Sequence, residues 1–124
     1  MTNSFVHVEL NSPDPKRAKA FYTGLFQWQL EDVDDPVVPD HTYTMVKPGK
    51  GPGVGGGIMK KVPNGPEGWL AYVHVDDIRA TTDKVKGLGG KFMKDVTEIP
   101  DTGRFSIIQD PTGVILGLWK PKPH

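Results

Sequence analysis

Two stretches of the chain, 63 positions apart, carry the same order of local signals, and this internal repeat limits the possible folds more than any other feature. Placing His7 opposite Leu70 also places Asp14 opposite Asp77 without a gap. In each copy a short apolar stretch leads to an aspartate and then to an amphipathic segment. Because a unit of this size cannot bury its apolar face alone, the repeat predicts two similar modules in one chain.

The first stretch of each copy is expected to be a β-strand. Val6, Val8 and Leu10 recur at every second position, which is the period of a strand with one buried face. The opposite face then carries Phe5, His7 and Glu9, an unusual mix for a surface that is only solvated. The corresponding strand of the second copy is expected over residues 69–75.

A helix is expected after each of these strands. Asp14 is predicted to cap the first helix, with Pro15 at its first position. Asp76 or Asp77 is predicted to cap the second helix, which ends at Gly89-Gly90. The side chains expected to face the core are Ala18, Phe21, Tyr22 and Leu25 in the first helix, and Ile78, Thr81 or Thr82, Val85 and Leu88 in the second.

Three further strands are expected after each helix, over residues 28–31, 42–47 and 57–60 in the first half and 91–96, 104–109 and 114–119 in the second. Each half is therefore predicted to be a βαβββ module, which makes the fold class α+β. Two tandem modules are expected to form an eight-stranded cup with the helices outside. We expect a single domain over residues 1–124, with module one at about 1–62 and module two at about 68–120.

The composition narrows the possible partners. Fifteen Lys and Arg residues balance fifteen Asp and Glu residues, so no net field attracts the protein to nucleic acid or to an anionic membrane. The absence of cysteine excludes disulfides, thiolate metal sites and thiol nucleophiles. No apolar run approaches the roughly 18 residues of a membrane span, and the first residues lack a signal-peptide pattern, so we expect a cytoplasmic protein. The expected partner is a small molecule or another protein chain.

Three local motifs occur in a fixed order across the two modules: Phe21-Tyr22 on the first helix, Gly89-Gly90 after the second, and Asp110-Pro111-Thr112-Gly113 before the last strand. Together with the repeat, this set resembles the vicinal oxygen chelate superfamily of glyoxalases, bleomycin-resistance proteins and extradiol dioxygenases. The resemblance covers nearly the whole chain. The closing stretch, residues 110–119, is similar to a glyoxalase-like branch of that superfamily.

The resemblance implies a divalent metal held by His and Glu side chains from the first and last strands of each half. His7 occupies the first of these ligand positions. The matching place in the second half is Leu70, the last strand has Gly117 where a Glu is expected, and residues 55–58 contain no carboxylate. Because His7 is the only retained ligand position, we expect no catalytic metal and no other cofactor.

The cup face is expected to carry the functional residues. His7 and Glu9 share one strand face and are candidate catalytic residues, as a proton-transfer pair, or candidate ligand-binding residues that only orient a bound molecule. Tyr72, His74 and Trp119 are expected on the same face as further ligand-binding residues, where aromatic walls suit a planar or carbonyl-bearing molecule. A replacement metal site built from His7, Glu9 and His74 stays an open alternative.

The glycines at 51, 53 and 56 match the spacing of a dinucleotide-binding loop. A strand-like stretch follows them, however, and such a loop needs a helix N-terminus to hold the pyrophosphate. We therefore expect a flexible loop that borders the cup and can serve as a lid.

The sequence thus favours a small-molecule binding protein of the glyoxalase and bleomycin-resistance type, which by the resemblance is a homodimer. The first alternative is an enzyme, a glyoxalase-like lyase or isomerase that uses His7 and Glu9 with an atypical metal site or none. The second alternative is a regulatory domain that binds a partner protein, which an apolar patch away from the cup would favour. The sequence leaves the identity of the ligand open.

Overall fold

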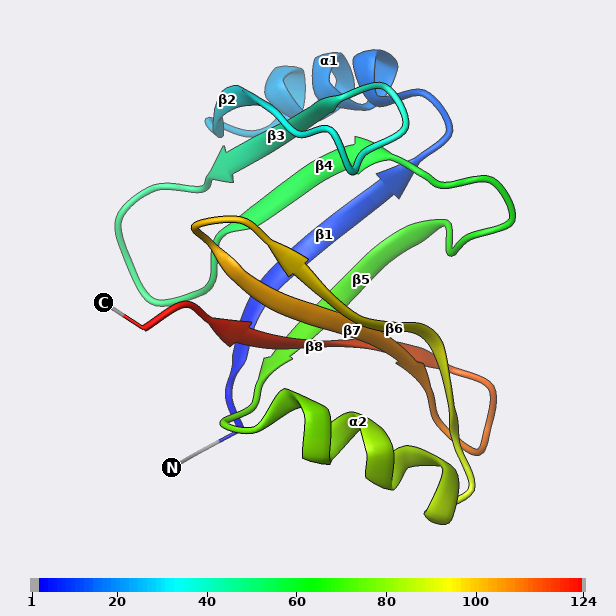
Figure 1. The fold of residues 1–124 in the computed structure, drawn as a ribbon. Helices are drawn as coiled ribbons and strands as arrows, with labels where there is room; N and C mark the ends of the chain where they lie inside the picture. The colour runs from blue at the N-terminus through cyan, green and yellow to red at the C-terminus, as the bar shows by residue number, and fades with distance from the viewer. Residues whose placement is uncertain (1–2, 124) are drawn as a thin grey trace. The chain divides into compact units, whose positions relative to one another are not determined.

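The computed structural model describes residues 3–123, in which eight strands and two helices divide into two compact units (Figure 1). One unit runs from His7 to Leu70, and the other combines residues 71–123 with residues 3–6. Within the described residues, neither helix has the length and apolarity needed to cross a membrane. The α+β class predicted from the sequence is confirmed.

The elements of the first module are β1 (Phe5–Ser12), α1 (Pro15–Leu25), β2 (Gln29–Asp34), β3 (Thr42–Lys47) and β4 (Gly56–Lys60). Its strands lie in the order β2-β3-β4-β1. β1 pairs with β4 in parallel, whereas β2 and β3, and β3 and β4, pair antiparallel. The long connection through α1 and two strands is what allows β1 and β4 to run in the same direction.

The second module repeats this arrangement with β5 (Gly68–His74), α2 (Ile78–Gly87), β6 (Lys91–Ile99), β7 (Gly103–Gln109) and β8 (Ile115–Pro121). Its order is β5-β8-β7-β6, with β5 and β8 parallel. Glu9 is opposite Gly57 in one module, and Tyr72 is opposite Gly117 in the other. Since Tyr72 lies 63 positions after Glu9, the repeat seen in the sequence is also a repeat of strand register. How the modules combine into a single-domain cup stays a prediction.

Both helices begin at the predicted aspartates. Asp14 Oδ1 accepts a hydrogen bond from the Arg17 backbone N–H at 3.2 Å, and Pro15 is the first helical residue. Asp77 Oδ1 accepts from the Ala80 N–H at 3.0 Å, so Asp77 rather than Asp76 caps α2. In each case the carboxylate satisfies one of the backbone donors that a helix leaves unpaired in its first turn.

The core under α1 is smaller than the sequence suggests. Its members are Leu10, Val46 and Ile58, against which Ala18, Tyr22, Trp28 and Leu30 pack. Phe21 and Leu25 were expected in the same stripe, but they are 62% and 59% exposed, so the prediction is wrong for these two residues. The large Tyr22 ring reaches from the helix to Trp28 and Trp69, and Phe21 and Leu25 remain outside it.

The core under α2 contains Val75, Ile78 and Leu118, with Val96, Ile108 and Leu116 against them. Thr82 rather than Thr81 is completely buried, and its hydroxyl lies 2.9 Å from that of Ser106. The prediction that Leu88 faces the core is wrong, because Leu88 is 77% exposed. It lies one residue beyond the end of α2, where Gly89 turns the chain with a φ of +93°.

The turn between β7 and β8 forms as predicted from Asp110-Pro111-Thr112-Gly113. The Gly113 N–H donates to the Asp110 carbonyl at 3.0 Å, and Gly113 has a φ of +97°. The Asp110 carboxylate accepts from the Thr112 hydroxyl and from the Val114 N–H. These hydrogen bonds lower the pKa of Asp110, and the bond from the Thr112 hydroxyl has the largest effect. The motif is thus fully explained as a turn that pairs the last two strands.

The glycine-rich loop between β3 and β4 has no nucleotide-binding geometry. Gly51 and Gly53 have φ angles of +133° and +132°, and Gly56 is the first residue of β4. Because a strand follows the loop, no helix N-terminus is available there for a phosphate. The role of this loop as a lid stays a prediction.

Candidate functional site

In each unit the helix covers one face of the sheet, and the predicted site residues lie on the other face. Leu10 and Ile58 belong to the core under α1, so their neighbours Glu9 and Gly57 point to the opposite face. Leu118 belongs to the core under α2, and its neighbours Gly117 and Trp119 likewise point away from the helix. We call these the helix-free faces of the two units.

The helix-free face of the first unit brings His7 and Glu9 together through Tyr43. The Tyr43 hydroxyl donates to Glu9 Oε1 at 3.0 Å and lies 2.7 Å from His7 Nε2. Because the single hydroxyl proton points to Glu9, the phenolic oxygen accepts the proton of His7 Nε2. The three side chains therefore form one hydrogen-bonded group, which we call the His7–Tyr43–Glu9 group.

Burial determines the protonation state of His7 in this group. Glu9 is 7% exposed, and desolvation by burial lowers the pKa of His7 below its usual value of 6.5. The imidazole is therefore neutral at pH 7, with Nε2 carrying the proton in the bond to Tyr43. A neutral imidazole with a protonated Nε2 presents Nδ1 as an acceptor. The group thus combines a carboxylate, a phenol and an imidazole in a largely dehydrated setting.

Tyr43 was not among the residues singled out from the sequence. It lies 36 positions after His7 and becomes its neighbour only through the β3–β4–β1 pairing. Gly57 of β4 leaves room for the phenol, because a Cβ atom there would overlap the Tyr43 ring. The sequence signal that could have indicated this space is Gly57, because a glycine within a strand often marks a place where another group approaches closely.

Asn11 continues the polar row of β1 and was also missed. Asn11 lies two residues after Glu9 and therefore shares its helix-free face. The Asn11 residue is only 5% exposed. Its amide nitrogen is buried and has no hydrogen-bond partner within residues 3–123. A buried donor in this state costs stability, and such groups in native proteins usually mark a bound water, ion or ligand.

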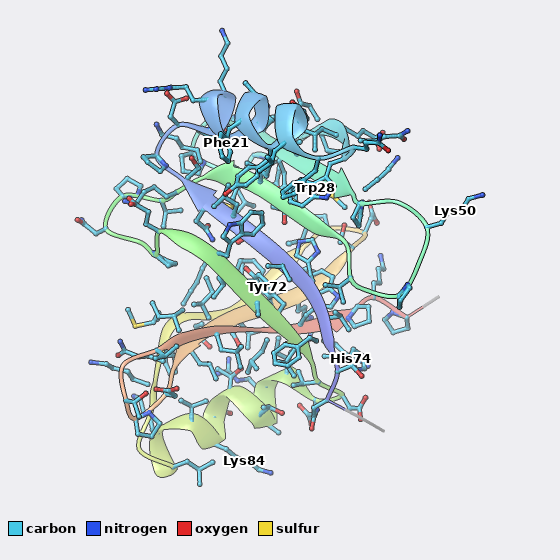
Figure 2. All side chains as sticks on the ribbon, turned by 180° about the vertical axis from the view of Figure 1, so that it is seen from behind. Phe21, Trp28, Lys50, Tyr72, His74 and Lys84 are labelled. Carbon is cyan, nitrogen blue, oxygen red and sulfur yellow. The ribbon has the colours of Figure 1, made fainter. Side chains whose placement is uncertain are left out.

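The second unit brings the other predicted residues to its own helix-free face. Tyr72 is opposite Gly117, and His74 is opposite Trp119, on the paired strands β5 and β8. Tyr72 is buried, and a Cβ atom at Gly117 would overlap its ring. The His74 backbone N–H donates to the Ser4 carbonyl at 2.9 Å. Figure 2 shows Tyr72 and His74 along β5. Their shared face agrees with the sequence analysis, whereas their role in ligand binding stays a prediction.

The residues present do not fit the divalent metal of the superfamily. The last strands of the two modules carry Gly57 and Gly117, and a tyrosine ring occupies the space over each glycine. Within residues 3–123 no three His, Asp or Glu side chains form a group that could hold a metal ion. The alternative set of His7, Glu9 and His74 draws on both units and stays a prediction.

Two βαβββ modules whose helix-free faces carry polar and aromatic side chains define a glyoxalase-type fold. The chain belongs to the Glyoxalase/Bleomycin resistance protein/Dioxygenase superfamily, whose family model matches residues 4–118. The resemblance derived from the sequence motifs is thereby confirmed.

Curated relatives support the same family. The glyoxylase-like protein CFP32 of Mycobacterium tuberculosis is 39% identical over 121 residues, which cover 94% of this chain and 45% of CFP32. The anthracycline biosynthesis protein DnrV of Streptomyces peucetius is 29% identical over 130 residues, which cover 90% of this chain and 45% of DnrV. The chain thus spans less than half the length of these two relatives.

Solved structures share the fold at low sequence identity. Hypothetical protein BH1468 from Bacillus halodurans superposes with a TM-score of 0.73 and 16% identity, covering 100% of this chain and 98% of that chain. Methylmalonyl-CoA epimerase from Mycobacterium tuberculosis superposes with a TM-score of 0.67 and 17% identity, covering 96% and 88% respectively.

Proposed function

We propose that the protein binds a small molecule on the helix-free face of its first unit, without the divalent metal of the superfamily. The observation that carries this proposal is the row of polar side chains on β1, where the His7–Tyr43–Glu9 group lies beside a buried Asn11 amide that lacks a protein partner. Ligand sites in proteins are mostly apolar and contain a few fixed polar groups of this kind.

The chemistry of these groups indicates the class of ligand. The Asn11 amide nitrogen is a donor, so it needs a hydrogen-bond acceptor such as a carbonyl or carboxylate oxygen. The neutral His7 imidazole carries no charge to pair with an anionic ligand, so it suits an uncharged polar group. We retain the expectation that the aromatic side chains Tyr72 and Trp119 of the second unit suit a flat molecule. The ligand expected from the residues is therefore planar and carbonyl-bearing.

The names of the relatives agree with such a ligand. DnrV is an anthracycline biosynthesis protein, and the fold neighbour from Mycobacterium tuberculosis is an epimerase of methylmalonyl-CoA. Both names refer to carbonyl-bearing compounds, and we extend only that chemical class to this chain. We also retain the expectations of a homodimer and of a cytoplasmic location.

A thermal-shift panel tests the proposal. Wild-type protein is incubated with bleomycin, an anthracycline and methylmalonyl-CoA, and any compound that raises the Tm is titrated by calorimetry. We expect binding to weaken at least tenfold in Asn11→Leu and in His7→Ala, since each removes a polar contact of about 1.4 kcal/mol or more. The matched control is His41→Asn, because His41 is exposed and lies outside the helix-free face residues named above. Binding that is unchanged in both site variants would place the ligand elsewhere.

A second candidate function, acid–base catalysis, is favoured by the lowered pKa of His7. A neutral imidazole can accept a proton from a bound carbonyl compound at the carbon next to the carbonyl, as a lyase or isomerase requires. Glu9, linked to His7 through Tyr43, would then stabilise the resulting imidazolium. The test is exchange of that hydrogen with deuterated water in any compound found to bind. Exchange that persists in His7→Ala would remove His7 from the reaction.

A further inference from the structure

On the helix-covered side of the first unit, α1 is shorter than the sheet strand beneath it. The helix has 11 residues and is about 16 Å long, whereas the 8 residues of β1 extend over about 26 Å. Leu10 lies in the core under the helix and is buried, but Val8, two residues earlier on the same face, is only partly buried. Part of the apolar sheet face is therefore left uncovered by α1.

A recess with a volume of about 280 Å³ lies over this uncovered part. Its floor is a row of three residues from neighbouring strands, since Gly56 is opposite Val8 in β1 and opposite Val46 in β3. A Cβ atom at Gly56 would come within 2.6 Å of the Val8 carbonyl oxygen. The backbone therefore keeps the middle of the floor free of a side chain, which leaves a hollow there.

Two tryptophans form walls of the recess, which we call the Trp28–Trp69 recess. Their indole rings meet at 80° with centroids 6.2 Å apart, so the two rings form a corner. Pro48 and Val54, from the glycine-rich loop, are also part of the lining. Figure 2 shows Trp28 near α1, toward the loop that carries Lys50. Among the described residues that line the recess, none has a charged side chain.

We propose that the Trp28–Trp69 recess is a second ligand site, which binds a flat, uncharged aromatic molecule of one or two rings. Aromatic rings prefer to meet edge to face or in an offset stack, and two indoles at 80° allow one guest ring to make both contacts. Pockets for drug-sized ligands have volumes of roughly 300–1,000 Å³, so the size of the recess favours a smaller molecule.

The character of the lining favours an uncharged guest. An ion that enters an apolar site loses hydration, and within the described lining no side chain of opposite charge compensates for that loss. Trp69, by contrast, is 46% exposed, so a guest that covers its ring removes apolar surface from water.

This site is independent of the ligand site proposed above. Val8 lies between His7 and Glu9 in β1, and its side chain points to the opposite face of the sheet. The recess therefore shares no side chain with the His7–Tyr43–Glu9 group, and the two faces of the first unit can bind different molecules.

Titration of wild-type protein with 1-naphthol tests the site, with the tryptophan indole N–H signals followed by nuclear magnetic resonance. The chain has three tryptophans, and Trp119, in β8 of the other unit, serves as the internal reference. We expect the signals of Trp28 and Trp69 to shift in a saturable way and that of Trp119 to stay in place. Trp28→Phe and Trp69→Phe assign the first two signals. If neither of these signals moves up to the solubility limit of 1-naphthol, the proposal is overturned.

A charge at the rim of the recess gives a second test. Val54→Asp places a carboxylate there, and should weaken 1-naphthol binding about tenfold or more because the guest would strip water from the charge. Val54 is 38% exposed in a loop, so the variant should fold. The matched control is Val62→Asp, in which a valine that is 40% exposed and lies outside the recess is replaced; it should bind as wild type does. Equal affinity of the two variants would contradict the site.

Two comparisons test the class of ligand. Decahydro-1-naphthol, which is saturated, and naphthalene-1-sulfonate, which is charged, should each bind about tenfold more weakly than 1-naphthol or worse. Equal binding of either compound contradicts the assignment to uncharged aromatic molecules. Asn11→Leu should leave the affinity for 1-naphthol unchanged, because Asn11 lies on the helix-free face. The two proposed sites can therefore fail separately.

Discussion

The ring of Tyr43 covers Gly57, so that a Cβ atom at position 57 would overlap the phenol. The same relationship occurs in the second module, where the ring of Tyr72 covers Gly117. These glycines lie in the last strands of the two modules, where the superfamily resemblance implies a metal ligand. In both modules, the glycine of the last strand and the tyrosine ring that covers it are thus two parts of one packing arrangement.

Substitution of Gly57 tests this arrangement. In Gly57→Ala the added methyl must displace the Tyr43 ring, which breaks its hydrogen bonds to His7 and Glu9 and costs about 1–3 kcal/mol of unfolding free energy, measured by urea denaturation. The matched control is Gly24→Ala in α1, where nothing lies within 4 Å of the new Cβ atom. The control should be more stable than wild type by about 0.5–1 kcal/mol, because alanine favours the helix. Equal effects of both substitutions would contradict the packing seen at Gly57.

Removal of the Tyr43 hydroxyl isolates its hydrogen bonds from the packing of its ring. We expect Tyr43→Phe to lower the free energy of unfolding by about 1–3 kcal/mol, since Glu9 is buried and loses a donor. Tyr22→Phe removes a hydroxyl from a ring that packs in the α1 core, and should change stability by less than about 0.5 kcal/mol. A Tyr43→Phe variant as stable as this control would mean that the hydroxyl does not stabilise Glu9.

The lowered pKa of His7 predicts how stability depends on pH. The unfolded chain binds a proton at His7 near its ordinary pKa of 6.5, whereas the folded protein binds it only at lower pH. The free energy of unfolding should therefore fall as the pH drops below about 6.5, by at most about 1.4 kcal/mol per pH unit for this one group. The loss should stop once the pH is below the folded-state pKa.

Denaturant titrations between pH 7.5 and pH 5 measure this dependence. His7→Gln should flatten it, while His41→Asn, in which His7 is retained, should preserve the slope of the wild type. Asp32 and Asp110 have pKa values lowered below the usual aspartate value of 3.8, so these groups do not contribute in this range. A slope that survives in His7→Gln would assign the dependence to another group.

Substitution of Asn11 should raise the free energy of unfolding and weaken ligand binding. Asn11→Leu replaces a buried amide nitrogen that lacks a partner within residues 3–123 with an apolar group of similar size. We expect a gain of about 1 kcal/mol in the unfolding free energy, together with the loss of ligand affinity described above. Thermal and urea denaturation measure the first effect and calorimetry the second. A less stable Asn11→Leu protein would show that the amide is satisfied in solution.

The buried pair of Thr82 and Ser106 provides a test in the second unit. Both side chains are completely buried, and their hydroxyl oxygens lie 2.9 Å apart. Each single variant, Thr82→Val or Ser106→Ala, leaves the other hydroxyl without this partner and should cost about 1–3 kcal/mol. The double variant should cost less than the sum of the two, because no lone hydroxyl remains. Strict additivity in urea denaturation would contradict the hydrogen bond.

The sequence alone predicted the features that depend on residues within a few positions of one another. Asp14 and Asp77 as helix caps, the turn at Asp110 to Gly113 and the alternation of β1 all follow from backbone geometry and local hydrogen bonding. The repeat extends these local signals to the order of the strands, which is why the sequence predicts the α+β class and the two βαβββ modules.

Only the tertiary structure decided which side chains meet across strands and which remain in solvent. Tyr43 reaches His7 across 36 positions because β4 carries Gly57 between them, and no local pattern encodes that space. Helical spacing could not show that Phe21 and Leu25 stay exposed, since it gives the direction of a side chain but not the extent of the sheet beneath it. Direction is a property of the local backbone, whereas contact depends on the elements that pack against it.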